Sequence, residues 1–405
     1  MDECGSAIGF LENKSILISG STGFIAKKKI LRIQPNVKKL YLLLRAADEI
    51  AAMQRFSNEV LDKNLFQVLK EKWGANLNSF ISKKVSVVCS DISISHMGLK
   101  DSICVEEIKH EVEIIINLAA TTKFNERYDV ALGTNTLGAK HVVNFAKQCP
   151  NFKLLVHVST GEREGLILET PHKLGESLNG TEGLSIEIEQ KVVEQRLKQL
   201  KDNGASEQVV TIAMKDLGIQ RANMFGWPNT YVFTKAMGEM IIDDLKDDLH
   251  LIIIRPTIVT STYKEPFPGW IEGARTMDSL IVGYAKGKLT MVPCDINSFL
   301  DVYFTEKPWI NRDGNAIKVG KLTVFNNMTS FHRYITIRYL IFLKILYHFL
   351  DLLVRFDDTN SEKLRRATHE KETNSNTLFL DPKDINWENY FVNVHLPRLV
   401  KYAIK

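Results

Sequence analysis

Short apolar runs alternate with amphipathic stretches along the first 160 residues of the chain. Each run has four or five residues, and the runs cover Ser15 to Ser19, Leu40 to Leu44, Val85 to Val88, Ile114 to Leu118 and Leu154 to Val158. Runs of this length are typical of strands buried on both faces, and the amphipathic stretches between them are typical of covering helices. The pattern therefore predicts an α/β fold with a doubly wound parallel sheet.

The predicted strands end at residues that suit ligand binding. These strand-end residues are Gly20, Arg45, Asp91 with Ile92, Ala119, and Ser159 with Thr160. Open α/β sheets bind ligands beyond the carboxyl ends of their parallel strands. We therefore expect these residues to meet at one edge of the sheet and to form one site there.

The pattern changes in the second half of the chain. Residues 183 to 203 form a charged amphipathic stretch that predicts a helix, and Leu251 to Ile254 is a further apolar run. From Pro308 onward the alternation stops, and residues 331 to 353 have a helical pattern. We expect two domains: a catalytic α/β domain over residues 1–302 and a smaller, mainly helical domain over residues 308–405.

Composition and charge exclude several classes of protein. The chain has 405 residues and a net charge of +4, with no basic run longer than Lys27 to Lys29, so we expect no nucleic-acid partner. Its five cysteines are scattered, which indicates reduced thiols and a cytoplasmic location. The N-terminus lacks the pattern of a secretory signal.

The apolar stretch from Tyr334 to Val354 is interrupted by four ionisable residues, Arg338, Lys344, His348 and Asp351. This interruption favours a core or membrane-surface helix over a membrane-spanning helix.

A glycine turn follows the first predicted strand. Gly20 and Gly23 enclose Ser21 and Thr22, and such a turn lets backbone N–H groups approach a pyrophosphate. Arg45 ends the second strand, where an NAD site carries an acidic residue, so it predicts a 2′-phosphate and hence NADPH. A solvated surface arginine is the alternative.

The next two strand ends extend the predicted cofactor site. Asp91 and Ile92 would face the adenine, with a simple strand-end turn as the alternative reading. Asn117 and Ala119 stand where the cofactor would cross the edge of the sheet. The full set of expected cofactor-binding residues is Gly20, Thr22, Gly23, Phe24, Ile25, Arg45, Asp91, Ile92, Asn117, Ala119, Tyr231 and Lys235.

Candidate catalytic residues lie further along the chain. Tyr231 and Lys235 are one helical turn apart, and a neighbouring ammonium lowers the pKa of a phenol so that it can transfer a proton near neutral pH. Ser159 and Thr160 would polarise a carbonyl group beside them. The alternative for the pair is a half-buried tyrosine beside a lysine whose ammonium reaches solvent. Asn229 and Arg255 would line the pocket, and Asn135 would be structural or hold a water molecule.

The spacing of ligand and nucleophile residues argues against two other chemistries. The ten histidines and five cysteines show no spacing typical of a metal site, so we expect no metal. The sequence also lacks the G-x-S-x-G turn of an esterase.

These motifs together resemble those of the extended short-chain dehydrogenase/reductases, and more narrowly the plant-type alcohol-forming fatty acyl-CoA reductases. The resemblance covers nearly the whole chain. It rests on Gly20-Ser-Thr-Gly-Phe-Ile-Ala26, Leu42-Leu-Leu-Arg45, His157-Val-Ser-Thr160, Phe225-Gly-Trp-Pro-Asn-Thr-Tyr231-Val-Phe-Thr-Lys235, Arg255-Pro-Thr-Ile-Val259, Pro266-Phe-Pro-Gly-Trp-Ile-Glu-Gly273, Pro308-Trp-Ile-Asn-Arg-Asp-Gly314 and Asp384-Ile-Asn-Trp-Glu-Asn-Tyr390.

The resemblance implies a Rossmann-type fold and the NADPH-dependent reduction of long-chain acyl-CoA to a primary fatty alcohol through an aldehyde. Tyr231 would protonate the developing alkoxide, Lys235 would tune Tyr231 and hold the ribose, and Thr160 with Ser159 would hydrogen-bond the substrate oxygen. The C-terminal domain would help to bind the acyl chain or a membrane surface. The resemblance also implies a peripheral position on the cytosolic face of the endoplasmic reticulum.

The chain is shorter than the family pattern at several points. The helix after Gly23 is expected to be shorter by about one turn, and residues are missing after Thr160 and after Val302. The alternative hypothesis is therefore a catalytically impaired relative that retains dinucleotide binding. A nucleotide-sugar epimerase or dehydratase of the same superfamily would share the Tyr231 and Lys235 pair, but it would not explain Pro266 to Gly273.

Overall fold

The computed structural model describes residues 7–26, 30–161, 165–257, 259–274, 278–279, 281–282, 286, 309–310, 316–317, 354–369 and 384–403. The chain divides into two compact units. The first contains residues 1–163 and 169–257, and the second contains residues 164–168 and 258–405. The helical pattern expected at residues 331–353 lies outside the described residues.

The first unit is built on a six-stranded parallel sheet, which confirms the fold class expected from the alternating pattern. The strand order is β3-β2-β1-β4-β5-β7, so the chain moves outward in one direction from β1 and then in the other from β4. The strands are β1 (Ser15–Ser19), β2 (Lys39–Leu44), β3 (Val85–Cys89), β4 (Ile114–Asn117), β5 (Leu154–Val158) and β7 (Leu251–Ile254).

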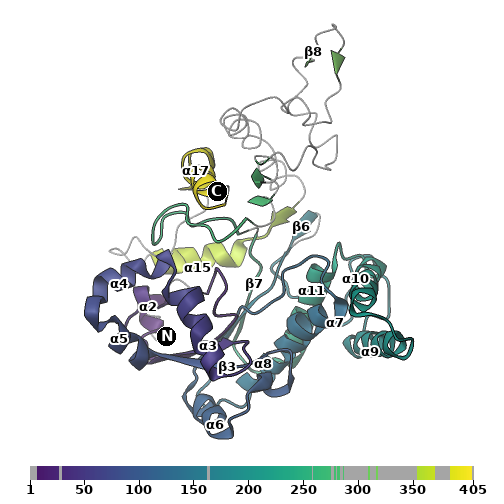
Figure 1. The fold of residues 1–405 in the computed structure, drawn as a ribbon, viewed down its shortest axis with the longest axis horizontal. Coiled ribbons are helices and arrows are strands. Elements are labelled where there is room, and N and C mark those ends of the chain that lie inside the picture. Colours follow the sequence, from purple (N-terminus) through teal and green to yellow (C-terminus); the bar gives the residue numbers. More distant parts are fainter. Residues whose placement is uncertain are drawn as a thin grey trace. The chain divides into compact units, whose positions relative to one another are not determined.

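Helices cover both faces of this sheet, as alternate strand residues point to opposite sides. Ile16 and Ile18 pack in one core cluster with α3, α4 and α5, whereas Leu17 packs in the other with α8 and α11. Figure 1 shows α4 and α5 on one side of the strands and α8, α10 and α11 on the other. The longer helices are α3 (Glu49–Phe56), α4 (Gln67–Trp73), α5 (Leu77–Lys84), α6 (Ser102–Glu111), α8 (Gly138–Ala146), α9 (Ile186–Asp202), α10 (Glu207–Met224) and α11 (Thr230–Leu245).

Shorter elements connect them. Single turns of 3-10 or π helix extend or join several helices, and α7 runs through η5 into α8 without a break. These elements are α1 (Ala7–Phe10), α2 (Ile30–Ile33), η1 (Ser57–Leu61), η2 (Asn64–Phe66), η3 (Gly74–Asn76), η4 (Ser95–Gly98), α7 (Tyr128–Ala131) and η5 (Leu132–Leu137).

Few residues after the glycine turn are described as helical. Residues 21–26 form turns, and α2 has only the four residues Ile30–Ile33. A cavity lies beside α2 and is lined by residues of the sheet, of α3 and of α4, among them Leu31, Leu42, Phe56 and Leu69. This face of the sheet is therefore incompletely filled beside α2.

Helix α11 is the most deeply buried helix segment near the expected site. Twelve of its sixteen residues are buried, including Lys235 and Glu239. The side chain of Asn229 caps its N-terminus by accepting a hydrogen bond from the backbone N–H of Val232 at 2.9 Å. The helix packs closely on η5, since a Cβ atom added at Gly238 would overlap the carbonyl oxygen of Asn135.

The described part of the second unit contains short strands and C-terminal helices. β6 pairs with β10 in parallel, and β8 pairs with β9 in antiparallel fashion. Its elements are β6 (Gly165–Ile167), β8 (Trp309–Ile310), β9 (Ala316–Ile317), β10 (Val354–Phe356), α15 (Thr359–His369), α16 (Trp387–Asn389), η8 (Tyr390–His395) and α17 (Leu396–Ala403).

A buried polar cluster fastens the C-terminal helices within this unit. His395 contacts the Asp278 carboxylate through Nε2 at 2.8 Å and the Ser261 hydroxyl through Nδ1 at 2.9 Å. The Tyr390 hydroxyl lies 2.6 Å from the same serine Oγ. Three segments that are far apart in the sequence are therefore held together by hydrogen bonds inside the second unit.

The contact of α11 with η5 gives a test of this packing. Gly238→Ala should destabilise the protein by about 1–3 kcal/mol, because the new methyl group has no room against Asn135. Gly133→Ala in η5 is the matched control, since its Cβ would meet only Ser93 at an ordinary 3.6 Å. Urea unfolding of both variants measures the difference. Equal stability of the two variants would contradict the packing described.

Candidate functional site

The glycine turn lies at the carboxyl end of β1, directly beside the chain that leaves β4. Gly20 has a φ of +66°, and its missing side chain is required there, since a Cβ atom would lie 2.7 Å from the backbone nitrogen of Ala119. The N–H of Gly23 donates to the carbonyl oxygen of Gly20 at 2.9 Å, which closes the turn. The turn thus packs backbone against backbone, and glycine at position 20 lets the chain that leaves β4 approach closely at this edge of the sheet.

Two arginines meet at the end of β2. The side chain of Arg45 is exposed and makes no hydrogen bond or ion pair with any other described residue. Arg55 on α3 donates from Nη1 to the backbone carbonyl of Arg45 and from Nη2 to the Thr22 hydroxyl at 3.3 Å. Arg55 therefore links the glycine turn to the end of β2, and it holds a bidentate contact with Glu59.

Sequence reasoning missed Arg55. It lies ten residues beyond the strand end, inside a helix, where an arginine paired with the carboxylate four residues later resembles an ordinary surface ion pair.

The third strand end is held by local contacts. One carboxylate oxygen of Asp91 accepts hydrogen bonds from the Ser93 backbone N–H at 3.0 Å and from the Ser93 hydroxyl at 2.7 Å. The Ile92 side chain is buried against Gly138, and its carbonyl oxygen contacts His141 Nδ1 at 2.8 Å. The strand-end turn, given as the alternative for these residues, is therefore present. In the glycine turn Phe24 is half-buried, whereas Ile25 is half exposed.

A buried chain of side chains crosses the carboxyl edge of the central strands. Ser19 of β1 donates to Asn117 of β4 at 2.6 Å, and the Asn117 Nδ2 lies 3.0 Å from Nδ1 of His157 on β5. The backbone N–H groups of Leu118 and Ala119 both donate to the Ser19 hydroxyl at 3.1 Å. The Asn117 side chain is thus committed to its neighbours, while Ala119 borders Gly20.

The expected catalytic residues come from β5 and α11. Ser159 and Thr160 directly follow β5 and are 2% and 8% exposed, and the Ser159 hydroxyl has no hydrogen-bond partner among the described residues. Tyr231 lies in the first turn of α11, where its half-buried ring stacks on Phe124 with the ring centres 6.1 Å apart. A serine hydroxyl that is buried and uncommitted suits the binding of a substrate oxygen.

Lys235 lies one turn further along α11 in an unusual environment for an ammonium group. It is 2% exposed and makes no ion pair or hydrogen bond with another described residue. Burial lowers the pKa of Lys235 to about 8, and the nearby Glu239 carboxylate opposes that change. The half-buried ring of Tyr231 agrees with the alternative reading of this pair, whereas Lys235 is more deeply buried than that reading requires. Its proton donors are available to Tyr231 and to a ligand.

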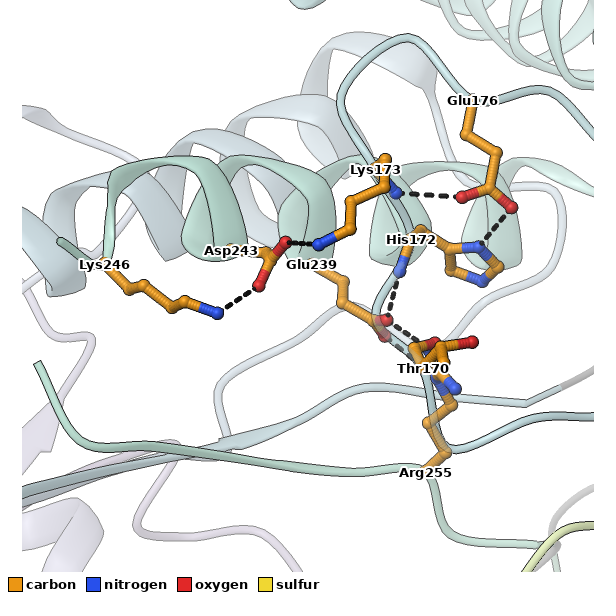
Figure 2. A network of polar contacts seen from close by, with 8 residues as sticks. All are labelled: Thr170, His172, Lys173, Glu176, Glu239, Asp243, Lys246 and Arg255. Atoms are coloured by element: carbon orange, nitrogen blue, oxygen red, sulfur yellow. Dashed lines mark hydrogen bonds and ion pairs between the residues drawn. The ribbon is translucent and has the colours of Figure 1, made fainter. Parts of the chain in front are cut away.

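Arg255 does not lie free to line a pocket, because it pairs with a buried carboxylate of α11. Its guanidinium makes a bidentate contact with Glu239, in which Nε lies 3.0 Å from Oε2, and it donates to the Thr170 carbonyl at 2.9 Å. Glu239 also accepts from the backbone N–H of His172 at 3.0 Å. Figure 2 shows these residues gathered below α11, so one carboxylate joins the helix, the end of β7 and the segment after residue 169.

A second set of contacts holds the same segment on the surface of α11. Asp243, one turn beyond Glu239, contacts Lys173 at 2.7 Å and Lys246 at 2.6 Å. Glu176 accepts from the backbone N–H of Lys173 at 2.8 Å and lies 3.1 Å from His172 Nδ1. Neither network was expected from the sequence, because their partners are far apart along the chain.

Asn135 has a structural role. Its amide donates to the Thr121 carbonyl at 3.2 Å and to the Thr234 hydroxyl at 3.0 Å, and its Oδ1 accepts from the Thr121 backbone N–H at 3.0 Å. It therefore joins η5 to α11 and to the chain after β4. Within the described ranges, no group of histidine, cysteine, aspartate and glutamate side chains is arranged to hold a metal ion. None of the helices described has the length and apolar character needed to cross a membrane.

We expect disruption of the Glu239 network to lower the free energy of unfolding much more than disruption of the Asp243 network. Glu239→Gln should lower the free energy of unfolding by about 3–5 kcal/mol, because it leaves the guanidinium of Arg255 buried without its counter-charge. Asp243→Asn should cost much less, because Lys173 is largely exposed and its charge is solvated. Urea unfolding of both variants tests this order. A Glu239→Gln variant as stable as Asp243→Asn would show that the buried pair does not hold α11.

Comparisons with known proteins agree with this site. The family model described as Male sterility protein, an NAD-binding model, matches residues 18–306. The chain is 43% identical to the Alcohol-forming fatty acyl-CoA reductase of Simmondsia chinensis over 492 aligned positions, which cover 100% of both chains. It is 42% identical to the Fatty acyl-CoA reductase 1 of Arabidopsis thaliana, with 99% of each chain covered.

Among solved structures, one match is the reductase domain of a nonribosomal peptide synthetase from Mycobacterium tuberculosis. The two chains are 16% identical, with a TM-score of 0.45, over 78% of this chain and 60% of that one. The Simmondsia relative differs in length from the present chain: 492 aligned positions against 405 residues leave at least 87 positions that the relative fills and this chain does not. Segments present in the relative are therefore missing here, as the motif spacing indicated.

The similarity to the plant enzymes extends over the full chain, and the parallel sheet, glycine turn and Tyr231 with Lys235 are all in place. The chain therefore belongs to the plant-type alcohol-forming fatty acyl-CoA reductases, a nicotinamide-dinucleotide-binding family of the extended short-chain dehydrogenase/reductases.

Proposed function

We propose that this protein reduces long-chain fatty acyl-CoA to a primary fatty alcohol through an aldehyde, with NADPH as the reductant. The observation that carries the proposal is Lys235, a lysine buried on α11 one turn from Tyr231 and free of any ion pair with a described residue. A buried ammonium group without an ion pair destabilises a fold, but beside a phenol it can promote proton transfer. The full-length similarity to a named alcohol-forming enzyme supports the substrate class.

The cofactor fits the residues at the carboxyl edge of the sheet. The glycine turn at the end of β1 would receive the pyrophosphate, and Tyr231 and Lys235 would hold the nicotinamide ribose. Bound NADPH would supply the hydride for each reduction. Arg45, exposed and unpaired with described residues, and Arg55, which reaches Thr22, would receive the 2′-phosphate. Asp91 and Ile92 would flank the adenine with the turn that they form.

In both steps, residues of the chain would bind the substrate oxygen and transfer the protons. In the first step the thioester carbon gains a hydride, and Tyr231 donates its phenolic proton to the carbonyl oxygen. The hydroxyl groups of Ser159 and Thr160 would bind that oxygen while its negative charge develops. As the carbon–sulfur bond of the resulting hemithioacetal breaks, its hydroxyl would return a proton to the Tyr231 phenolate, and the CoA thiolate would leave and take a proton from solvent. In the second step the aldehyde gains a hydride, and Tyr231 protonates the alkoxide to give the alcohol.

Lys235 would act through its charge. An ammonium close to Tyr231 stabilises the phenolate that forms after each proton transfer. Because burial lowers the pKa of Lys235 to about 8, the ammonium form is present at neutral pH and is lost as the pH rises through that value.

We place the protein in the cytoplasm, at the periphery of the endoplasmic reticulum on its cytosolic face. The product is a long-chain alcohol, which partitions into membranes, and an enzyme on the surface would release it there. The C-terminal domain over residues 308–405 would contribute to binding the acyl chain, with residues 1–302 as the catalytic domain.

A catalytically impaired relative that keeps dinucleotide binding is the second candidate. The observation that favours it is the set of at least 87 positions present in the Simmondsia enzyme and missing here. The cavity beside α2, in the cofactor-binding half of the sheet, supports this candidate. Binding of NADPH without turnover would identify this candidate.

The catalytic role of Tyr231 is tested in cells that express the chain. Cells with the unmodified protein should accumulate primary fatty alcohols, and cells with Tyr231→Phe should lose at least about 99% of that output, since proton donation contributes roughly 10²–10⁴-fold. Chromatography of cellular lipids measures the alcohols, and Tyr263→Phe, in the second unit, serves as a matched control with normal output. Undiminished alcohol from the Tyr231→Phe cells would overturn the mechanism.

The choice of cofactor is tested with Arg45→Ala. Loss of a charge-assisted contact of about 1.5–3 kcal/mol should weaken NADPH binding by roughly 10- to 100-fold. NADH, which lacks the 2′-phosphate, should bind almost as before and is the control within the same protein. Calorimetric titration with both dinucleotides gives the two ratios. An equal effect on NADH and NADPH would show that Arg45 does not recognise the phosphate.

A further inference from the structure

The Ser19 hydroxyl has a single possible hydrogen-bond direction. It accepts from the backbone N–H groups of Leu118 and Ala119, both at 3.1 Å, so its two acceptor positions are used. The only hydrogen left on the oxygen must therefore donate, and it points to Oδ1 of Asn117 at 2.6 Å. This contact orients the Asn117 amide, with the oxygen toward β1 and the nitrogen toward β5.

The orientation of Asn117 in turn determines the tautomer of His157. The Asn117 nitrogen has hydrogens and no acceptor position, and it lies 3.0 Å from His157 Nδ1. Nδ1 must then offer its lone pair, which leaves the single ring hydrogen on Nε2 and excludes the imidazolium form. Burial and, secondarily, the charge of Lys235 lower the pKa of His157 well below its ordinary value, in agreement with a neutral ring.

The Nε2–H of His157 is directed to the face of the sheet below α11. Leu155, His157 and Ser159 alternate along β5 and share one face, and Leu155 packs in the same core cluster as Met237 of α11. His157 is 1% exposed, and its Nε2 has no acceptor among the described residues. The Ser159 hydroxyl on the same face also has no partner there. Buried N–H groups without an acceptor are rare, so this one calls for an explanation.

We propose that His157 is a positioning residue that links the cofactor turn to the catalytic lysine: its tautomer, fixed from Ser19 through Asn117, presents a ring N–H toward Lys235. This inference rests on the proposed reductase function. An N–H cannot accept a hydrogen bond from an ammonium, so Lys235 keeps its hydrogens for Tyr231 and the ribose. The opposite tautomer would present a lone pair, bind Lys235 and draw it away from Tyr231.

Two neighbours of Lys235 besides His157 have partners or positions that do not depend on a tautomer. On α11, Glu239 lies one turn further but is held by Arg255 from the end of β7. Tyr231 is the intended partner on the same helix. η5, which packs against α11, has the sequence LGTNTL and contributes no ionisable side chain. His157 on β5 interacts electrostatically with Lys235, and among the described groups shown to do so it is the one whose hydrogen-bonding character depends on a tautomer.

The tautomer is measured directly by ¹⁵N NMR of the full-length protein with labelled histidine, with His157→Leu identifying the signals. We expect a neutral ring, protonated on Nε2 only, from pH 6 to pH 9. An Nδ1–H ring or an imidazolium signal at neutral pH would overturn the proposal. This measurement needs no turnover, so it stands apart from the proposed reductase function.

The effect on Lys235 is measured with Asn117→Asp, which has the same shape but only acceptor atoms on the side of the ring. The hydrogen of His157 should move to Nδ1, and Nε2 should then accept from Lys235. Proton loss from Lys235, followed by the ¹³Cε signal of labelled lysine, should shift up by about one pH unit, as expected for one hydrogen bond to a charged group. The turnover number should fall at least about ten-fold.

The double variant Asn117→Asp with His157→Leu separates the ring from the new carboxylate. If the ring carries the effect, the titration of Lys235 should return toward that of the unmodified protein. A shift that persists without the ring would assign the effect to the charge of Asp alone and overturn the proposal. Should the unmodified protein show no turnover, the proposed function fails, while the two NMR titrations still decide the role of His157.

Discussion

The structure depends on one constraint: a lysine that must keep its charge is held in the interior, on a helix with almost no exposed side. Lys235 is 2% exposed, and burying an ammonium costs several kcal/mol unless other groups compensate. Groups around α11 offset part of the free-energy cost of burying this ammonium. Glu239 supplies a nearby negative charge that is itself paired with Arg255, and Asn135 and the close contact at Gly238 fix the helix on η5.

The parallel sheet brings the remaining parts of the site to the same edge. The order of its strands places the ends of β1, β4 and β5 side by side, with Ser19, Asn117 and His157 in register. Cofactor-binding and catalytic segments therefore share one hydrogen-bonded row. A cavity beside α2 lies on the other face of the sheet, away from α11.

Much of this arrangement was readable from the sequence, because strands buried on both faces leave a strong local signal. The six runs from Ser15 to Ile254 were located within one residue, the helix over residues 183–203 within three, and the turn at Gly20 at its position. What local patterns could not show were contacts between distant segments. The pairing of Arg255 with Glu239, the reach of Arg55 to Thr22 and the tautomer of His157 all depend on which side chains the fold brings together.

The central claim is that this chain carries out both reductions. The most direct test is the stoichiometry of the purified protein with a long-chain acyl-CoA and NADPH, following NADPH absorbance, free thiol and the lipid product together. The account predicts two NADPH oxidised for each CoA released, with primary fatty alcohol as the product. Binding of NADPH with no oxidation and no thiol release would contradict it, and would show a protein that keeps the cofactor site of its family without the reaction.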